Sequence, residues 1–360
     1  MGITERIENL RGLFTEKGID GILISQPYNR FYLSGFRGSE GYLLITGKQL
    51  IIVVDSRYTE QAKIQSSDFE LFNLTGKMED WFANLAGGLG IKRLGFESSD
   101  VTYAFYHQLT AILKKKQIPL QLIATDGIVE SLRTVKEPAE IELIEKAVTI
   151  SDLAITHIQQ IIEPGMTELQ AAWEIEKFMR ENGSQTVPFE LIVASGGNSA
   201  LPHALPSEKI IQSGEPVMID IGAKYKDYTS DITRTICIGT PDKNFCKVYD
   251  TVLGAQLAAI AIIKEGMTGE AADNVARTVI QEGGYSNNFG HSLGHGIGLE
   301  THELPRLAMR SMNRLVNGMV FSIEPGIYLP EWGGVRIEDT VVMDKGKIRV
   351  LSKAEKIVKS

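Results

Sequence analysis

The sequence predicts a mixed α/β (α+β) chain that folds as two domains. Short apolar runs bounded by turn residues alternate with helical segments in the first third of the chain, which is typical of a small α/β domain. The 360 residues exceed what a single hydrophobic core usually organises, so a second domain is expected behind the first. A repeated turn in that second domain indicates that it contains two related halves.

The N-terminal domain is predicted from an amphipathic helix followed by buried strands. Residues 3–17 place their apolar side chains on one helical stripe, and Gly18 lies at the C-cap position. Further helical segments are expected at 58–65 and 102–115. Four compact apolar runs are predicted as buried strands: 21–25, 49–54, 94–96 and 120–123.

The domain boundary is predicted within residues 125–136, which gives an N-terminal domain of 1–128 and a second domain of 129–360. A long helix then begins near Pro138, because proline is tolerated in a first turn, and Pro164-Gly165 ends it.

A weak internal repeat follows this helix. Glu163-Pro-Gly-Met-Thr167 and Lys264-Glu-Gly-Met-Thr268 each close one helix and open another, and Thr167 has capping-box spacing to Gln170. The repeat indicates two helix–turn–helix units, although a match of three residues can also arise by chance.

The composition excludes several classes of partner. The net charge is -8 with no basic block, so neither nucleic acid nor an anionic membrane is an expected partner. The first residues carry charges where a signal peptide needs an apolar core, and the most apolar helical stretch, 255–263, is too short to span a bilayer. Cys237 and Cys246 cannot form a disulfide framework, which fits a reduced cytoplasm.

Two aspartates are candidate metal ligands. Asp220 ends the apolar run Val217-Met-Ile-Asp220, and Asp231 follows eleven residues later, after a plausible hairpin that would bring the two carboxylates together. Aspartates at such a spacing are often only turn residues or caps. An aspartate after a buried run needs a partner, however, and a metal ion is a strong one.

Three more residues complete the candidate site. Glu324 ends the run Met319-Val-Phe-Ser-Ile-Glu324, Glu338 follows Val335-Arg-Ile, and His295 lies between glycines in His291-Ser-Leu-Gly-His295-Gly. Each carboxylate alone could pair with a neighbouring cation such as Arg336. Four carboxylates and one imidazole together balance two divalent cations and leave room for a hydroxide, which indicates a hydrolase.

The chain holds six histidines, and four of them lie in the same region as these carboxylates: His203, His291, His295 and His302. His107 and His157 lie in predicted helices and are interpreted as surface or packing residues. The glycines around His295 argue against a zinc-binding helix of the His-Glu-x-x-His type and favour a tight backbone passage close to a ligand.

Taken together, these runs resemble the Xaa-Pro peptidase branch of the pita-bread metallopeptidases, which includes methionine aminopeptidase, prolidase and aminopeptidase P. The resemblance covers the whole chain, with a creatinase/prolidase-type domain over residues 1 to about 125 and a pita-bread catalytic domain with pseudo-twofold halves after it. It implies that Asp220 binds one metal ion, that His295 and Glu324 bind the other, and that Asp231 and Glu338 bridge both.

The resemblance also implies roles for the remaining polar residues. His203 and His302 match substrate-contacting histidines that stabilise the reaction intermediate, and His291 matches another active-site histidine. Glu324 would shuttle a proton as well as ligate. Family members use manganese or cobalt and sometimes zinc, and many are homodimers.

The expected activity is cleavage of the bond between an N-terminal residue and proline. A dipeptidase must also bind the carboxylate just past the proline, and Arg306, in His302-Glu-Leu-Pro-Arg306, is a candidate clamp, with Arg336 as a second. This run favours an Xaa-Pro dipeptidase (prolidase) over aminopeptidase P, and a solvated loop arginine is the alternative interpretation of Arg306. Phe189 and Tyr228 are candidate walls of a proline pocket, or ordinary core.

A pure binding module is the remaining alternative, because some relatives of this fold have lost the metal ions. The complete ligand set argues against it. Methionine aminopeptidase fits less well, because it needs no N-terminal domain of this kind.

Overall fold

The computed structural model describes residues 2–356 and divides the chain into two compact units, Met1–Arg133 and Thr134–Ser360. They are termed the N-terminal unit and the C-terminal unit. The division lies within the segment 125–136. The observed boundary comes after the short helix α7 (Ile128–Arg133), so this helix belongs to the N-terminal unit. The boundary predicted after residue 128 would place most of α7 in the second domain.

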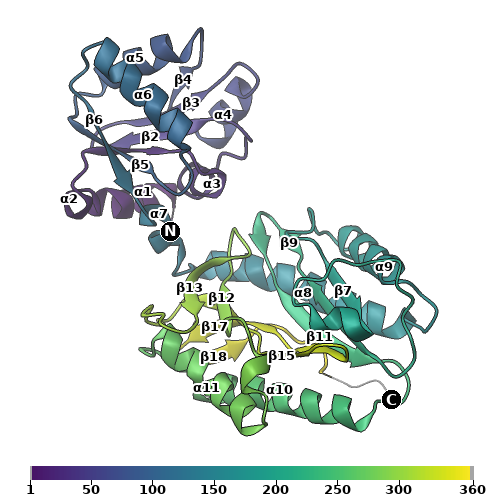
Figure 1. The fold of residues 1–360 in the computed structure, drawn as a ribbon. Helices are drawn as coiled ribbons and strands as arrows, with labels where there is room; N and C mark the ends of the chain where they lie inside the picture. Colours follow the sequence, from purple (N-terminus) through teal and green to yellow (C-terminus); the bar gives the residue numbers. More distant parts are fainter. Residues whose placement is uncertain (1, 357–360) are drawn as a thin grey trace. The chain divides into compact units, whose positions relative to one another are not determined.

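The N-terminal unit is built on a six-stranded mixed sheet with the strand order β4-β3-β2-β1-β5-β6 (Figure 1). β1 pairs antiparallel with β2 and parallel with β5. The strands are β1 (Gly21–Ile24), β2 (Tyr42–Thr46), β3 (Leu50–Val54), β4 (Glu70–Asn73), β5 (Arg93–Glu97) and β6 (Gln121–Thr125). The other helices are α1 (Ile3–Gly12), α2 (Phe14–Lys17), α3 (Pro27–Ser34), α4 (Thr59–Gln65), α5 (Met78–Gly88) and α6 (Tyr103–Lys115).

The elements predicted for this unit are confirmed. The first helix breaks into α1 and α2 and ends at Gly18, whose φ of 68° is a left-handed value that glycine adopts without strain. The four predicted strands are β1, β3, β5 and β6. The prediction missed β2 and β4. The apolar side chains of α5 and α6 cover one face of the sheet and form a hydrophobic cluster with its strands.

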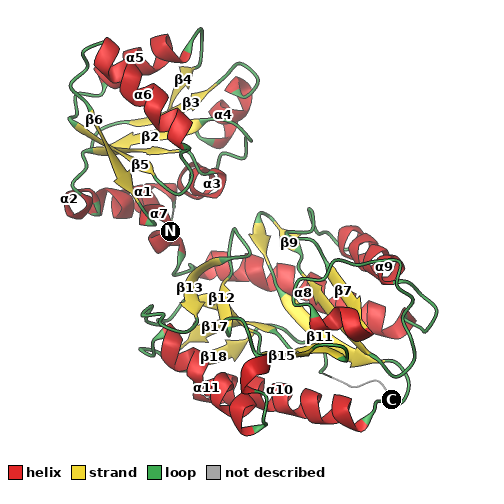
Figure 2. Cartoon of the chain, viewed as in Figure 1, coloured by secondary structure: helices red, strands yellow, loops and turns green. Residues whose placement is uncertain are grey.

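The first half of the C-terminal unit packs two helices against a small sheet (Figure 2). The helices are α8 (Pro138–Ile161) and α9 (Glu168–Glu181). The sheet has the order β11-β8-β7, with β7 (Ile192–Ser195), β8 (Pro216–Ile221) and β11 (Ile232–Cys237), and all its pairs are antiparallel. The 3₁₀ helix η1 (Gly196–Ala200) follows β7, and the hairpin β9 (Lys224–Tyr225) and β10 (Tyr228–Thr229) joins β8 to β11.

The second half repeats this plan with two helices followed by strands. The two helices are α10 (Lys243–Ile262) and α11 (Gly269–Glu282), and the short 3₁₀ helix η2 (Ser286–Asn288) follows them. The five-stranded sheet has the order β13-β12-β14-β17-β18, with β12 (Gly294–Gly296), β13 (Glu303–Leu307), β14 (Val320–Ile323), β17 (Asp339–Asp344) and β18 (Lys347–Val350). A separate hairpin joins β14 to β17 and consists of β15 (Gly326–Leu329) and β16 (Gly333–Arg336).

The internal repeat read from the sequence is present in the backbone. Thr167 and Thr268 are the N-caps of α9 and α11, and each side chain accepts a hydrogen bond from the third residue of its helix. The preceding methionines are also equivalent: the Met166 carbonyl accepts from Ile211 N at 2.9 Å, and the Met267 carbonyl accepts from Leu315 N at 2.9 Å. The two halves therefore share one folding pattern.

The helix α10 is longer than the apolar stretch 255–263 suggested. Over the described residues it is the one helix whose 20 residues are long and apolar enough to cross a bilayer by length and composition. Its side chains at Phe245, Val248 and Val252 are fully buried in the core of the second half, as expected of a core helix.

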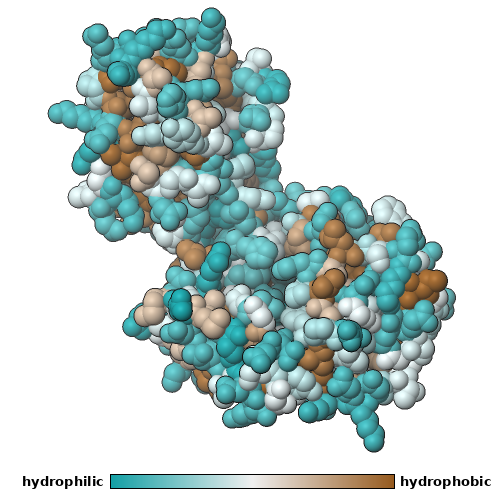
Figure 3. Space-filling model, in the orientation of Figure 1, coloured by the Kyte–Doolittle hydropathy of each residue, from teal (hydrophilic) through white to brown (hydrophobic). Residues whose placement is uncertain are grey.

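Each half of the C-terminal unit has its own hydrophobic cluster. The first cluster lies among α8, α9 and the β7–β8–β11 sheet, and the second lies among α10, α11 and the five-stranded sheet. Ala354, which follows the last strand of the second half, belongs to the first cluster. On the face shown in Figure 3, hydrophilic residues predominate and hydrophobic residues lie in separate groups.

Candidate metal centre

The two aspartates of the site come from neighbouring strands of the first half. Asp220 lies on β8, and Asp231 directly precedes β11, which pairs antiparallel with β8. The register places Asp220 opposite Thr233, and Thr233 shares a face with Asp231 because side chains alternate along a strand. The predicted hairpin between the two strands is present.

The other three candidate ligands come from strand ends of the second half. His295 lies on β12, Glu324 follows β14, and Glu338 precedes β17. Backbone hydrogen bonds fix these ends: Glu324 N donates to the Leu293 carbonyl at 2.8 Å, and Glu338 N donates to the Thr233 carbonyl at 3.0 Å. The second of these bonds joins the two halves directly at the site.

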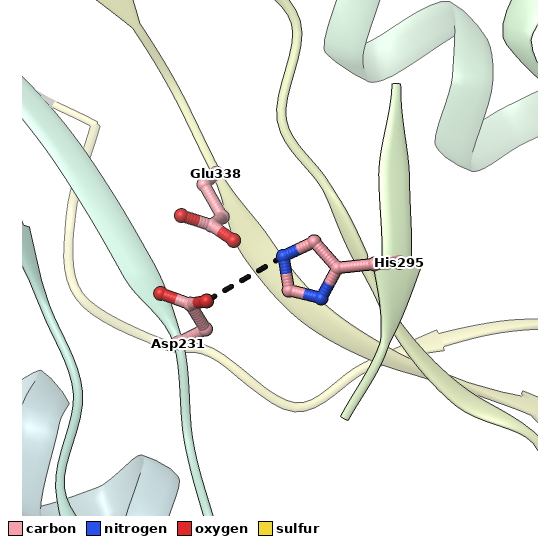
Figure 4. A group of neighbouring side chains, drawn as sticks. All are labelled: Asp231, His295 and Glu338. Atoms are coloured by element: carbon pink, nitrogen blue, oxygen red, sulfur yellow. Dashed lines mark ion pairs between the residues drawn. The ribbon is translucent and has the colours of Figure 1, made fainter. Parts of the chain in front are cut away.

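The candidate ligands converge. One ligand atom each from Asp231, His295 and Glu338 lies within 4.8 Å of the others, and the three side chains point toward one another (Figure 4). His295 Nε2 is 3.7 Å from Asp231 Oδ2 and 3.2 Å from Glu324 Oε1. Asp220 lies close enough that its charge raises the pKa of both Asp231 and Glu338, behind burial and their nearest carboxylate neighbours.

The imidazole of His295 is oriented for ligation. Its Nδ1 is 3.1 Å from the Gly296 carbonyl, which can only accept, so Nδ1 is protonated and donates to it, while Nε2 faces Asp231 and Glu324. Metal-binding histidines are held in this way, with the second ring nitrogen donating to a backbone carbonyl. Ser322 Oγ accepts from His295 N and donates to Glu324 Oε1, each at 3.0 Å, and ties these two residues together.

The electrostatics of the site call for bound cations. Burial, followed by the neighbouring carboxylates, raises the pKa of Asp231 and Glu338 well above the ordinary values. Burial also opposes ionisation of Glu324, but the hydrogen bond and the charge of His295 outweigh it and lower its pKa to about 2. Several carboxylates in one buried site cannot all ionise without opposite charge.

Two carboxylate oxygens support the same conclusion. Among the described residues, Asp220 Oδ1 and Glu338 Oε1 are buried and have no hydrogen-bond partner. An unsatisfied buried carboxylate oxygen is costly, and a metal ion is its natural partner. Oxygen donors with one imidazole suit divalent cations. The donor set therefore fits divalent metal ions.

The three other histidines surround the ligands in different ways. The rings of His302 and His295 lie 4.3 Å apart between centroids, and His302 is exposed. His203, also exposed, follows η1 and lies near enough for its charge to contribute to the lowered pKa of His291 and His302, after desolvation and nearer charges. His291 is half-buried and lies 2.9 Å from the Tyr328 hydroxyl.

Arg336 is part of the support for the ligands. Its side chain is buried, and its guanidinium donates to Asp220 Oδ2 at 2.5 Å and to the Tyr328 hydroxyl at 2.7 Å. The sequence analysis considered Arg336 as a partner of Glu324 or Glu338, but in the structure the carboxylate it pairs with is that of Asp220. Tyr328 in turn contacts His291, so one hydrogen-bonded chain runs from Asp220 to His291. The sequence analysis missed Tyr328, although it lies only four residues after Glu324.

The remaining sequence candidates lie at the edge of the site or in the core. Arg306 is exposed on β13 and is the cross-strand partner of His295. Tyr228 is 4% exposed and donates its hydroxyl to Glu140 Oε1 at 2.6 Å, as a core tyrosine does. Phe189 is half-buried against Gly222, two residues past Asp220.

The charge of the site predicts a pH dependence for the metal-free protein. Because the folded-state pKa values of Asp231 and Glu338 are raised, their contribution to stability is present below the ordinary carboxyl pKa and is lost as the pH rises toward the raised values. The free energy of unfolding, measured with urea in the presence of a chelator, should therefore fall less between about pH 4 and 8 for Asp231→Asn than for the parent. An equal fall in the two proteins would show that Asp231 does not cause this pH dependence.

Comparison with known proteins agrees with the geometry. Residues 6–135 match the creatinase/prolidase N-terminal domain, and residues 142–345 match metallopeptidase family M24. A structure of Xaa-Pro dipeptidase from Bacillus anthracis is 44% identical, with a TM-score of 0.95 over 99% of both chains. The Xaa-Pro dipeptidase of Pyrococcus horikoshii is 40% identical over 98% of both chains. A structure of X-Pro aminopeptidase from Thermotoga maritima is 38% identical, with a TM-score of 0.89 over 98% of this chain and 99% of the other.

Three findings indicate the same family. Two family models match in the expected order, the relatives align over the full length, and the carboxylates converge in one site. The chain belongs to metallopeptidase family M24 and carries a creatinase/prolidase N-terminal domain.

Proposed function

We propose that this chain is a dinuclear metal-dependent Xaa-Pro dipeptidase. The observation that carries the proposal is the convergence of Asp231, His295 and Glu338, with Asp220 and Glu324 beside them, around carboxylate oxygens that lack a protein partner. In this proposal Asp220 would hold one ion, His295 and Glu324 would hold the other, and Asp231 and Glu338 would contribute to holding both. Manganese or cobalt is favoured, and zinc also fits the donor set.

The chain's own residues divide the remaining work. Two divalent ions held at this site would supply an activated water near neutral pH and a positive charge for the scissile carbonyl. Glu324 accepts a proton from the attacking water and passes it to the leaving proline nitrogen. His302 and His203, both exposed at the edge of the ligands, donate to the oxygen that gains charge. The free amino group of the substrate lies near Asp220.

His291 and Arg336 act through other groups. Arg336 holds one oxygen of Asp220 and leaves Oδ1 for a metal ion, and Tyr328 connects it to His291. The guanidinium of Arg336 is buried in these contacts, so we assign recognition of the substrate carboxylate to Arg306 instead. Arg306 is exposed and paired across the β12–β13 ladder with His295, which places a cation beside the ligands.

The test of the dipeptidase assignment is a comparison of substrates. The metal-stripped protein, restored with manganese, cobalt or zinc, is expected to hydrolyse an Xaa-Pro dipeptide faster than the matching Xaa-Pro-Xaa tripeptide. Arg306→Ala should reduce kcat/KM for the dipeptide by roughly 10- to 100-fold, as expected for the loss of a charged hydrogen bond of about 1.5–3 kcal/mol, and should leave the tripeptide nearly unchanged. Arg310→Ala, an exposed arginine of the same segment, is the matched control.

A second candidate function is Xaa-Pro aminopeptidase, which acts on longer peptides. The full-length relative of that name from Thermotoga maritima favours it. Faster turnover of tripeptides by the parent would establish this alternative. We further propose that the protein is a homodimer. We also propose that it works in a reducing cytoplasm, because the thiols of Cys237 and Cys246 are free.

A further inference from the structure

Arg234 lies directly behind the candidate metal centre. It belongs to β11, three residues after Asp231, and is 1% exposed. A guanidinium has five N–H donors, and burying one without partners is costly. The partners that this arginine uses therefore show which parts of the fold it connects.

The donors of Arg234 reach three separate segments. Nη1 donates to the Thr233 carbonyl of its own strand at 3.0 Å and to the Glu338 carbonyl at 2.5 Å. Nη2 donates to Asp339 Oδ1 at 2.8 Å and to the Ala354 carbonyl at 2.7 Å, and Nε donates to the same carbonyl at 3.2 Å. All five N–H donors are thus accounted for by these bonds.

The segment 352–356 is held from several sides. The backbone N–H groups of Lys353 and Ala354 both donate to Asp152 at 2.8 Å, which attaches the segment to α8. Lys356 Nζ lies 2.6 Å from Asp339 Oδ2. Ala354 is buried in the hydrophobic cluster of the first half, although it follows the last strand of the second half. This segment therefore returns from the second half to the first.

These contacts surround Glu338, a candidate bridging ligand. Thr233 donates its hydroxyl to Glu338 Oε2 at 2.7 Å, and Arg234 holds the carbonyl of the same glutamate. Asp231, the other candidate bridging ligand, directly precedes β11, the strand that holds Arg234. The relative position of the two bridging carboxylates, which come from different halves, is thus set by bonds that converge on Arg234.

We propose that Arg234, Asp339, Ala354 and Lys356 form a clasp that positions Asp231 and Glu338 for metal binding, so that the segment 352–356 is a working part of the metal centre. The clasp rests on the proposed function only through the metal site. Arg234 and Lys356 are positioning residues, because neither is placed to contact an ion or a substrate.

The proposal is tested by titrating metal-stripped full-length protein with Mn²⁺ alone and by recording the visible absorption of the Co²⁺ form. Arg234→Met is expected to weaken Mn²⁺ binding by roughly 10- to 100-fold, the usual effect of removing support from metal ligands, and to alter the Co²⁺ spectrum. Lys356→Met is expected to shift both readouts in the same direction by a smaller factor, because Asp339 keeps its bond to Arg234.

Two controls match these variants. Arg349→Met removes an arginine that also joins the second half to α8, but through an exposed pair with Glu145. Lys353→Ala removes an exposed side chain from the segment itself and leaves its backbone bonds in place. Both are expected to bind Mn²⁺ with the parent affinity and to give the parent Co²⁺ spectrum.

The possible results distinguish the clasp, the metal centre and the proposed activity. If Arg234→Met does not fold, the same two measurements are made on Lys356→Met and on a chain that ends at residue 351. Parent-like Mn²⁺ affinity and Co²⁺ spectrum in folded clasp variants would overturn the clasp. A parent that binds no Mn²⁺ overturns the metal centre and the clasp with it. A parent that binds metal but does not hydrolyse Xaa-Pro peptides overturns only the proposed activity.

Discussion

Replacing Asp231 by Asn is expected to abolish metal binding and peptide hydrolysis together. The substitution keeps the size of the side chain but removes the charge of a buried carboxylate that lies within 4.8 Å of His295 and Glu338. Because this residue is proposed to bridge both ions, its loss should affect both sites, and Glu338→Gln should behave in the same way. The effect should exceed the 10- to 100-fold loss typical of residues outside the ligand shell.

The measurement is metal content after dialysis against Mn²⁺, together with turnover of an Xaa-Pro dipeptide. Asp227→Asn is the matched control, because this aspartate lies four residues earlier in the β9–β10 turn and adopts a φ of 75° that asparagine tolerates. Two bound ions and parent activity in Asp231→Asn would exclude this residue as a bridging ligand.

Replacing Glu324 by Gln is expected to separate catalysis from metal binding. The amide keeps an oxygen at the end of β14, where Ser322 donates to Glu324 Oε1 at 3.0 Å, so much of the ligand geometry is retained. It cannot accept a proton, however, and proton transfer by a positioned side chain typically contributes about 10²- to 10⁴-fold. We therefore expect kcat to fall by that factor while the protein still takes up metal.

Metal content and kcat must be measured on the same preparation of this variant. Glu331→Gln changes an exposed glutamate in the β15–β16 hairpin that follows Glu324 and should leave both quantities unchanged. If Glu324→Gln keeps the parent kcat, the proton passes through another group. If it loses its metal as completely as Asp231→Asn, ligation alone explains its effect.

Local patterns in the sequence predicted much of the fold. Apolar runs with flanking turn residues indicated β1 and β3, and the Thr167 capping box indicated the start of α9; the structure confirms these elements. The strand β2 was missed although Tyr42–Thr46 carry the same apolar, β-prone composition. β2 lies between β1 and β3 and pairs with both of them. Pairing between strands cannot be inferred from the few residues of one strand alone.

Asp220, Glu324 and Glu338 could be recognised because each one follows a buried run, where an unpaired carboxylate is costly. The residues that support them carry no such signal. Arg234 reads as one more polar residue of β11, yet its partners at Glu338 and Ala354 lie 104 and 120 residues away in the chain. Arg277 likewise holds the carbonyl of His291 from α11, at 2.7 Å. Such support becomes visible only when distant segments are brought together.

The shared folding pattern of the two halves has a consequence for cohesion. Asp220 and Asp231 come from one half, and the other candidate ligands come from the second, so neither half holds a complete donor set. An ion bound between them acts as a reversible cross-link across the seam. By mass action, free metal at 100 times its dissociation constant would add about 2.7 kcal/mol against their separation. Resistance to heat and to proteolysis at this seam would then depend on the metal supply of the surroundings as well as on the sequence.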